Sequence, residues 1–386
     1  MQILLVTGPG GAGTSTVAAA TAVQLVAAGS RCVLLTTQPA AVAGLDAAVE
    51  VDLVAPQPVL EQLWARHADE FAAALPVVTV PPASSVVAVP AAAEFAVLAA
   101  LAGHAAAGRT DVVVLDAGPT TSALALLALP GALRWWLAQA APPRLRVLAT
   151  LRSAVVPGRP GGAAALLGGV ATLEELIGRV QLADPATTAV HLVLRPEPAS
   201  ADALRAAATG LGVLGQRVAS VTVDRVLPAL PGEWAAQRAQ VQQDALDRLS
   251  ALVTPVLGRL RQVAETAVPP ADVPALQALE AAVPTSVPEP APSPEPQRDG
   301  GDWLLAVPLP FARRGEVELT RWADDLVLTA AGQRRSLTLD PLLRRCTVAG
   351  GTLTCPDTAG ATLEVRFTPD PAQWPAGLLE NEGSRP

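Results

Sequence analysis

Short apolar runs alternate with longer alanine-rich or amphipathic stretches through the first two thirds of this chain. An uninterrupted apolar run is typical of a strand buried on both faces, whereas apolar residues three and four positions apart predict a helix. The runs predict strands at residues 2–7, 31–36, 111–116, 190–194, 218–223 and near 253–257. The longer stretches predict helices at residues 15–28, 58–74, 94–107, 161–180, 199–211 and 231–252. This alternation predicts an α/β fold with a doubly wound, mostly parallel sheet.

The pattern changes at residues 283–300, where proline, serine and glutamate dominate, as in a stiff extended linker. Beyond it, apolar and polar residues alternate with a period of two, which is typical of strands with one buried face. The alternating positions are Leu305/Val307, Val317/Leu319, Leu326/Leu328, Leu337/Leu339 and Leu363/Val365/Phe367. We therefore predict an α/β domain at 1–282, a linker at 283–300, a small antiparallel β-sandwich at 301–369 and a tail at 370–386.

The first predicted strand leads into a glycine-rich turn, and an alanine-rich helix follows. This order is the frame of a phosphate-binding loop, in which glycines let backbone N–H groups face an anion at a helix N-terminus. The spacing fits G-x-x-x-x-G-K-[ST] at Gly8, Gly13 and Ser15. The candidate phosphate-binding residues are Gly8, Gly10, Gly11, Gly13, Thr14, Ser15 and Thr16.

Thr14 stands where this pattern has a lysine that contacts the β- and γ-phosphates. Losing one such charge-assisted contact costs about 1.5–3 kcal/mol of binding. The chain has no lysine at all, so its 27 basic residues are arginines, as a GC-rich genome would favour. Arginine was nevertheless available at this position and is not used. The loop has the backbone of a phosphate site without its strongest phosphate ligand.

A second signal is the apolar run at residues 111–116, which ends in Asp116. An aspartate at the end of a buried strand commonly holds Mg²⁺ or its water in proteins with a phosphate-binding loop. Many buried strands end in aspartate, so this signal is weak alone and gains weight from the loop. Together they predict that Ser15 and Asp116 hold Mg²⁺ if a nucleotide binds.

Composition narrows the remaining classes of function. A formal net charge of −8 without a basic stripe argues against nucleic-acid binding. Three cysteines without a C-x-x-C pair give no zinc signature and are typical of a reducing compartment. Glycines and prolines interrupt the uncharged stretches, so we expect no signal peptide and no integral membrane span. We expect a cytoplasmic protein in which His67, His104 and His191 are structural.

Two further features leave alternatives open. The apolar residues 124–137 suit core packing, and they also suit an exposed groove or a dimer face, where tryptophan is enriched. Arg152 or Arg159 is a candidate for the missing positive charge, supplied in trans as arginine fingers are.

Cys346 and Cys355 flank Gly350-Gly351 symmetrically. A two-residue turn at these glycines would bring the thiols within reach of a disulfide. The alternative places the turn at residues 356–360, where Pro-Asp…Gly is strong turn chemistry, and makes the glycines a bulge in one long strand. We favour the second alternative.

Several motifs in a specific order resemble the anion-pump ATPase (ArsA) family, which includes the ATPase that delivers tail-anchored membrane proteins. The C-terminal sandwich resembles the α-crystallin-like (small-heat-shock-type) domain of bacterial members. This resemblance implies a homodimeric, magnesium-dependent ATPase in which Pro119 and Asp224 also belong to the nucleotide site. The motifs are the opening loop, Gln38-Pro39-Ala40, Asp116–Thr120, Asp224–Pro228, Leu126–Pro130 and the helix with Trp234, Arg238 and Gln242.

The departures from the family pattern fall on its chemistry. The two lysines of the family loop are Pro9 and Thr14 here, and the first normally reaches the partner protomer's nucleotide. The aspartate that positions the attacking water is Gln38, and the asparagine that reads adenine is Asp224, which lacks amide donors. The zinc-binding C-x-x-C of eukaryotic members is absent. High GC content does not by itself produce glutamine or aspartate.

These departures lead to one main hypothesis and two alternatives. The main one is an ArsA-type ATPase fold with impaired or lost ATP hydrolysis, acting as a dimeric scaffold or chaperone-like binder of hydrophobic protein clients. The first alternative is a slow Mg²⁺-dependent ATPase that drives an open–closed cycle for protein targeting or anion export. The second is a regulatory subunit that forms a heterodimer with an intact paralogue.

Overall fold

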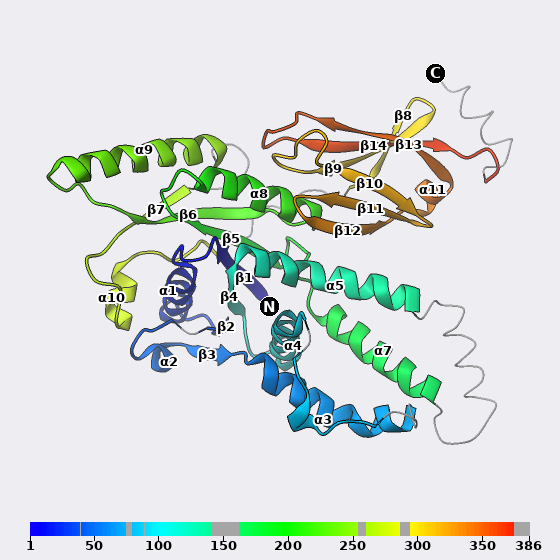
Figure 1. The fold of residues 1–386 in the computed structure, drawn as a ribbon, viewed down its shortest axis with the longest axis horizontal. Helices are drawn as coiled ribbons and strands as arrows, with labels where there is room; N and C mark the ends of the chain where they lie inside the picture. Colours follow the sequence, from blue (N-terminus) through cyan, green and yellow to red (C-terminus); the bar gives the residue numbers. More distant parts are fainter. Residues whose placement is uncertain are drawn as a thin grey trace. The chain divides into compact units, whose positions relative to one another are not determined.

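The computed structural model describes residues 1–38, 40–74, 79–88, 90–140, 162–253, 260–285 and 294–373. It divides into two compact units (Figure 1). The first comprises Met1–Leu182 and Thr266–Thr285, and the second comprises Ala183–Glu265 and Ser286–Pro386. A seven-stranded sheet has the order β3-β2-β4-β1-β5-β6-β7, and two smaller antiparallel sheets follow. The predicted doubly wound fold with a C-terminal all-β part is therefore confirmed.

In the first unit, buried apolar strands form a parallel array. The strands are β1 (Gln2–Gly8), β2 (Cys32–Thr36), β3 (Glu50–Leu53) and β4 (Val112–Pro119). The printed pairings of β1 with β4, β4 with β2 and β2 with β3 are all parallel. Leu4, Leu5 and Leu115 are fully buried, which explains why these strands read as continuous apolar runs.

The helices of this unit cover the strands and add a helical group beside them. They are α1 (Thr14–Ala27), α2 (Leu45–Ala48), α3 (Pro56–Ala74), the 3₁₀ turn η1 (Ala83–Ser85), α4 (Ala92–Ala107), α5 (Thr120–Ala140), α7 (Gly162–Arg179) and α10 (Val273–Ala278). α1 packs on β4, β2 and α10, while α3, α4, α5 and α7 pack against one another (Figure 1). Because β4 runs directly into α5, the strand end with Asp116 lies close to a helix start.

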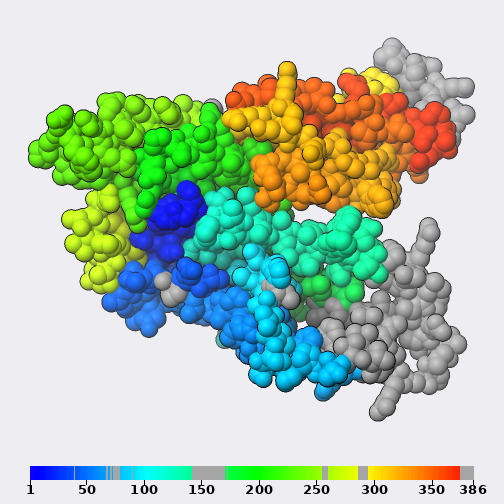
Figure 2. All heavy atoms as spheres, viewed as in Figure 1, coloured from blue at the N-terminus to red at the C-terminus, as the bar shows by residue number. Residues whose placement is uncertain are grey.

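Helix α5 is buried in its first half and exposed near its end, so core packing of residues 124–137 is confirmed in part and the groove or dimer face stays a prediction. Leu124, Leu126 and Leu127 are buried, whereas Trp136 near the helix end is 64% exposed. The turquoise atoms of this end lie at the surface in the space-filling view (Figure 2). Within the described residues, α5 alone has the length and apolar composition to cross a membrane, a test that core helices of water-soluble proteins also pass.

The second unit joins the remaining α/β elements to the sandwich. Its first part consists of β5 (Thr188–Leu194), α8 (Ser200–Val213), β6 (Val218–Val226), α9 (Glu233–Val253) and β7 (Leu260–Ala264), with parallel β5–β6 and β6–β7 pairs. The sandwich consists of β8 (Pro296–Asp299), β9 (Asp302–Pro308), β10 (Glu318–Trp322), β11 (Asp325–Ala330), β12 (Gln333–Thr338), α11 (Pro341–Arg344), β13 (Cys346–Thr354) and β14 (Thr362–Pro369). Its two sheets have the orders β10-β11-β12 and β13-β14-β9-β8.

Three sequence predictions need correction or completion. The strand β7 lies at Leu260–Ala264; of the strand predicted near 253–257, only Val253 is among the described residues, and it belongs to α9. Both ends of the stretch 283–300 belong to folded structure. Val283 is buried and donates its N–H to Thr21 Oγ1 at 3.0 Å, and residues 296–299 form β8. The strands β3 and β8 were not anticipated.

The structure decides between the two turns considered for Cys346 and Cys355. β13 continues through Gly350 and Gly351, with a register shift between Val348 and Gly350, and reverses after it into β14. The favoured alternative of one long strand is confirmed, but the bulge lies at Ala349, and Gly350 and Gly351 are paired with Arg366 and Val365. Cys346 is buried, Cys355 is exposed, and neither forms a disulfide.

Candidate nucleotide site

The glycine-rich loop has the geometry of an anion site. Gly11 and Gly13 have positive φ values of 76° and 92°, a region that L side chains rarely adopt. The Ala12 N–H donates to the Pro9 carbonyl oxygen at 3.2 Å and closes the turn. Gly13 is the N-cap of α1 and has no side chain to cap the helix. The first N–H groups of α1 therefore remain available for an anion.

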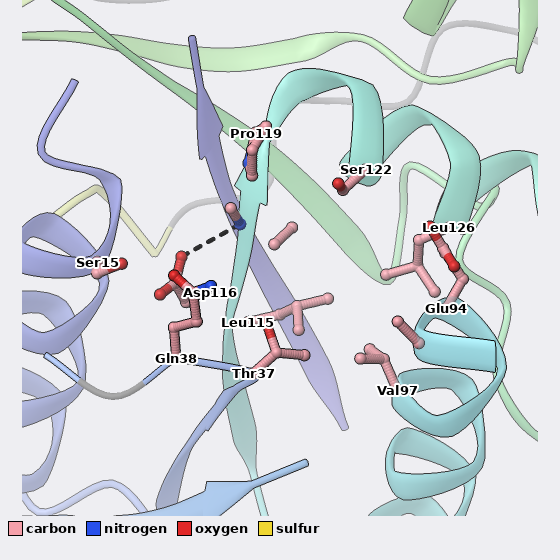
Figure 3. A pocket seen from close by; sticks show the side chains of 13 residues that line it. Ser15, Thr37, Gln38, Glu94, Val97, Leu115, Asp116, Pro119, Ser122 and Leu126 are labelled. Atoms are coloured by element: carbon pink, nitrogen blue, oxygen red, sulfur yellow. Dashed lines mark hydrogen bonds between the residues drawn. The ribbon is translucent and has the colours of Figure 1, made fainter. Parts of the chain in front are cut away.

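Asp116 lies at the point where β4 passes between the ends of β1 and β2. It is 6% exposed, and in the parallel register it faces Thr36 of β2 and Val6 of β1. Thr36 Oγ1 is 3.1 Å from Asp116 Oδ2. On the other carboxylate oxygen, the Gly118 N–H donates to Asp116 Oδ1 at 3.2 Å, the dashed line in Figure 3. Both carboxylate oxygens are held, so the orientation of this side chain is fixed.

The same threonine connects Asp116 to the segment with Gln38. The Gln38 N–H donates to Thr36 Oγ1 at 3.1 Å, and the Gln38 carbonyl oxygen is 2.9 Å from it. On the other side, Thr7 Oγ1 donates to the Gly118 carbonyl oxygen at 2.9 Å. The ends of β1, β2 and β4 thus form one hydrogen-bonded cluster.

A cavity of about 350 Å³ opens at these strand ends (Figure 3). Four of the predicted site residues line it, and they come from three segments: Ser15 from α1, Gln38 from the segment after β2, and Asp116 and Pro119 from β4. Gly8, Gly10, Gly11, Gly13, Thr14 and Thr16 lie in the adjoining loop and first turn of α1, and Pro9 lies between Gly8 and Gly10. The complete lining is Ser15, Thr37, Gln38, Ala93, Glu94, Val97, Leu115, Asp116, Ala117, Gly118, Pro119, Ser122 and Leu126.

The cavity has an acidic lining. Glu94 from the first turn of α4 and Ser122 from α5 were missed by sequence reasoning, because nothing in their local sequence marks them. Glu94 and Asp116 are the only ionisable side chains among the described residues that line the cavity. A bare triphosphate would be repelled by two carboxylates, whereas a magnesium–nucleotide complex would not.

These residues suit Mg²⁺ better than they suit phosphate. Hydroxyl and carboxylate oxygens are the ligands that Mg²⁺ prefers, and Ser15 and Asp116 would hold it. Mg²⁺ would supply the positive charge that neutralises phosphate oxygens. The phosphates themselves would be held by backbone N–H groups of the loop, without a lysine at position 14.

Asp224 belongs to the second unit, at the end of β6. It is 8% exposed, and burial raises the pKa of its carboxyl above the ordinary value. The β6–β7 register shifts between Val223 and Val226, and Arg225 has a φ of 60°. A bulge with a left-handed arginine is a strained backbone of the kind found at functional sites. The role of Asp224 in a nucleotide site stays a prediction.

The remaining candidates do not form a second site. His104 Nε2 is 2.8 Å from Asp52 Oδ2, and His191 Nδ1 is 2.7 Å from Ser220 Oγ. The side chain of His67 and the whole of Arg152 and Arg159 lie outside the described residues. Across the described ranges, no cluster of three or more histidine, cysteine, aspartate or glutamate side chains suits a metal ion.

Comparison with known proteins agrees with this architecture. The model of the anion-transporting ATPase family matches residues 1–70 and 47–257, and that of the HSP20-like domain found in ArsA matches residues 300–367. The uncharacterised protein SCO2128 of Streptomyces coelicolor is 34% identical over 98% of this chain and all of its own length. Protein Rv2184c of Mycobacterium tuberculosis is 30% identical over 97% of both chains.

A more distant relative is the arsenical pump-driving ATPase of Escherichia coli, which is 28% identical over 64% of this chain and 44% of its own length. The family match covers the glycine-rich loop, the strand with Asp116 and the segment with Asp224. The chain therefore belongs to the anion-transporting ATPase (ArsA) family and carries that family's HSP20-like domain.

Proposed function

We propose that this protein is an ArsA-family member that binds MgATP weakly, hydrolyses it poorly or not at all, and serves as a dimeric, chaperone-like binder of apolar protein segments. The observation that carries the first half is the cavity at the loop. It combines fixed magnesium-type ligands with an acidic lining, a neutral Gln38 and no lysine at position 14.

Weak binding follows from the missing cation. Backbone N–H groups and Mg²⁺ supply part of the attraction for phosphates, and the absent lysine removes about 1.5–3 kcal/mol. Poor hydrolysis follows from Gln38, which lines the cavity but cannot accept a proton from water as a carboxylate can.

Binding of apolar segments is supported by the exposed end of α5. Trp135 and Trp136 meet edge to face, with ring centroids 4.9 Å apart, and Trp136 is largely exposed. An exposed tryptophan beside a second aromatic ring is a favourable anchor for an apolar partner. Homodimerisation, or pairing with an intact paralogue, is the assembly that we expect.

One observation favours the first alternative, a Mg²⁺-dependent ATPase with low turnover. Ser15 and Asp116 are both present at the cavity, and Asp116 is held in a single orientation by two hydrogen bonds. A preorganised magnesium site would serve such an enzyme. Turnover would then depend on positioning and electrostatics alone.

The deciding experiment measures binding and turnover on the full chain. Fluorescent ATP is titrated with and without Mg²⁺, and phosphate release is followed under saturating MgATP. We expect binding only with Mg²⁺, and release no faster than in a Ser15→Ala, Asp116→Asn double variant. Release well above that control would falsify the hydrolysis-deficient proposal and establish the slow ATPase.

A further inference from the structure

The C-terminal end of α8 is buried on every side. All seven residues from Ala207 to Val213 are buried, including Thr209 and the helical glycines Gly210 and Gly212. A helix that packs against one sheet leaves a polar stripe exposed, so continuous burial means that a second partner covers its outer side. That partner is the sandwich, because α8 packs against β9, β11 and β12 within the second unit.

Gly212 permits this close approach. A Cβ at this position would lie 3.0 Å from Pro310 Cδ and 3.1 Å from the Pro308 carbonyl oxygen. Glycine disfavours a helix interior, so its presence there calls for a packing reason, and this contact supplies one. One turn earlier, Thr209 Oγ1 lies 2.6 Å from the Pro310 carbonyl oxygen.

The sandwich core is completed by α8. Val213, 1% exposed, belongs to the same buried cluster as Leu305, Leu328 and Phe367 of the sandwich strands. Beyond the helix, the Arg335 guanidinium of β12 lies against Gly215, where it leaves no room for a Cβ. Burial lowers the pKa of Arg335 below its ordinary value, in keeping with a guanidinium covered by protein.

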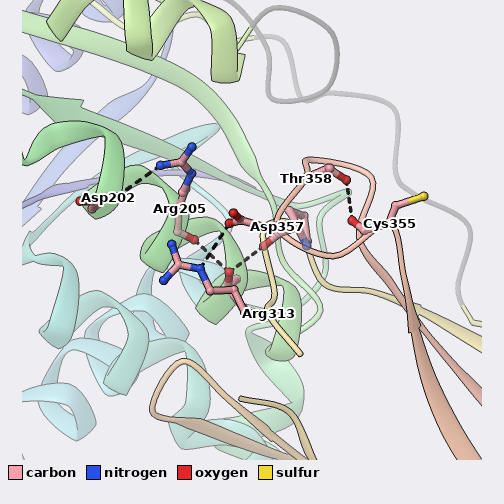
Figure 4. A network of polar contacts seen from close by, with 8 residues as sticks. Asp202, Arg205, Arg313, Cys355, Asp357 and Thr358 are labelled. Atoms are coloured by element: carbon pink, nitrogen blue, oxygen red, sulfur yellow. Dashed lines mark hydrogen bonds and ion pairs between the residues drawn. The ribbon is translucent and has the colours of Figure 1, made fainter. Parts of the chain in front are cut away.

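The segment that α8 touches is itself held rigidly. The Leu309 N–H donates to the Ala361 carbonyl oxygen at 2.9 Å, and the Phe311 N–H donates to that of Thr358 at 2.7 Å. Arg313 Nε is 3.3 Å from Asp357 Oδ1, in the contact network that Figure 4 shows beside Arg205 of α8. Residues 308–313 and the turn after β13 therefore form one braced junction.

Backbone strain is concentrated at this junction. Phe311, Cys355 and Asp357 have positive φ values of 61°, 45° and 59°, which residues other than glycine rarely adopt. Strained backbone of this kind persists only where the surrounding contacts over-determine it.

We propose that α8 is a fixed seat for the sandwich, so that the sandwich is carried as one body with β5, α8 and β6 rather than moving freely on a proline-rich tether. A displacement of α8 then displaces the sandwich with it. For client binding this inference rests on the function proposed above: the sandwich face formed by β11 and β12 beside α8 is closed to clients, and client binding by the sandwich is confined to its other surfaces.

The test follows the rotation of a fluorophore on Cys355 in the full chain. Cys355 is the exposed thiol, whereas Cys32 and Cys346 are buried and burial raises the pKa of Cys32 to about 11, so labelling is selective. We expect the anisotropy decay of the native chain to show fast probe motion and whole-molecule tumbling only. Gly212→Leu should add a component several times faster than whole-molecule tumbling, which is the rotation of a released sandwich.

Gly103→Leu is the matched control, because Gly103 is also helical and a Cβ there would meet nothing within 4 Å. The proposal would be overturned if the anisotropy decay of the native chain already contained a component with the rotation time of a free sandwich. It would also be overturned if the decay of Gly212→Leu were the same as that of the native chain. If Gly212→Leu does not fold, Gly212→Ala is compared with Gly103→Ala by hydrogen exchange. We expect at least threefold faster exchange in β9, β11 and β12 for Gly212→Ala alone, and equal exchange in both variants would refute the seat.

Discussion

Thr14 is the residue at which the loop most clearly departs from a strong phosphate site. The backbone around it is suitable, since Gly13 is left-handed and α1 begins directly after it. Thr14→Lys should therefore strengthen MgATP binding by the 1.5–3 kcal/mol of one charge-assisted contact, which is roughly a tenfold to hundredfold fall in Kd. Titration with fluorescent ATP measures this change. Thr14→Gln, of similar length but neutral, should leave Kd nearly unchanged, and equal gains in both variants would contradict this account.

His191 should make the free energy of unfolding depend on pH. It is 1% exposed, and desolvation lowers its pKa from 6.5 to about 3, so it is neutral in the folded protein above that value. The unfolded chain binds a proton there below about pH 6.5, so the free energy of unfolding is highest above that pH and falls as pH drops toward 3. Between pH 6.5 and pH 5 the loss from this group is about 1.6 kcal/mol.

Urea unfolding at several pH values measures the effect. In His191→Gln, which keeps a polar partner for Ser220, the decline between pH 6.5 and pH 5 should be smaller by that amount. The carboxylates titrate alike in both chains, so the difference isolates His191. Parallel pH profiles would mean that the histidine is not held neutral.

Sequence reasoning anticipated part of the site at this scale. The carboxyl ends of parallel strands meet at one edge of a sheet. The convergence of four cavity residues was therefore predictable, because each lies at or just after a strand end or at the start of α1: Ser15, Gln38, Asp116 and Pro119. Glu94 and Ser122 come from the first turns of helices whose packing no local pattern reveals. The acidic character of the cavity was therefore not predictable from sequence.

The pairing of β2 with β4 is the element-scale feature that supports the site. It places Thr36 opposite Asp116, with both side chains buried. Thr36→Val removes the hydroxyl partner of a buried carboxylate and should lower the free energy of unfolding by about 1–3 kcal/mol. The shift of the urea midpoint at constant slope measures it. Thr36→Ser keeps the hydroxyl and should lose less than half as much, so equal losses would assign the effect to packing alone.

Element boundaries were predictable where a strong period or a stop signal exists. α1 ends before Gly29 and α4 ends before Gly108, both left-handed glycines at helix ends. β7 was not anticipated because its sequence, Leu-Arg-Gln-Val-Ala, lacks an apolar run and has a single buried residue. The edge strand β8 carries Pro-Gln-Arg-Asp, which has no strand signature.

At the scale of the whole chain, the sequence pattern separated an α/β part from a β-sandwich, and the family matches agree with this order. The pattern did not reveal that α8 and the sandwich share a core. The contact rests on Gly212, which by itself predicts a weak point in a helix, and on Pro308 and Pro310, which predict a loop. Tertiary packing overrides local propensity at this point. The predicted linker marks where the chain passes from the α/β part to the sandwich, but it does not by itself imply that the sandwich moves freely.

The proposed client binding makes a prediction for the whole molecule. If the end of α5 anchors apolar segments, Trp136→Glu should weaken binding of a fluorescent, leucine-rich helical peptide by about 2 kcal/mol, or roughly thirtyfold, the size typical of an interface anchor. Trp322→Glu is the matched control, because Trp322 is exposed to a similar degree, 58% against 64%, but lies on β10 of the sandwich. Both substitutions replace an exposed side chain, so both should leave the melting temperature within about 2 °C. Selective loss of peptide binding in Trp136→Glu supports α5 as the client surface, whereas equal loss in both variants shows nonspecific adhesion to exposed tryptophans. Loss in Trp322→Glu alone would move the client surface to the sandwich, on a sheet edge that α8 leaves open.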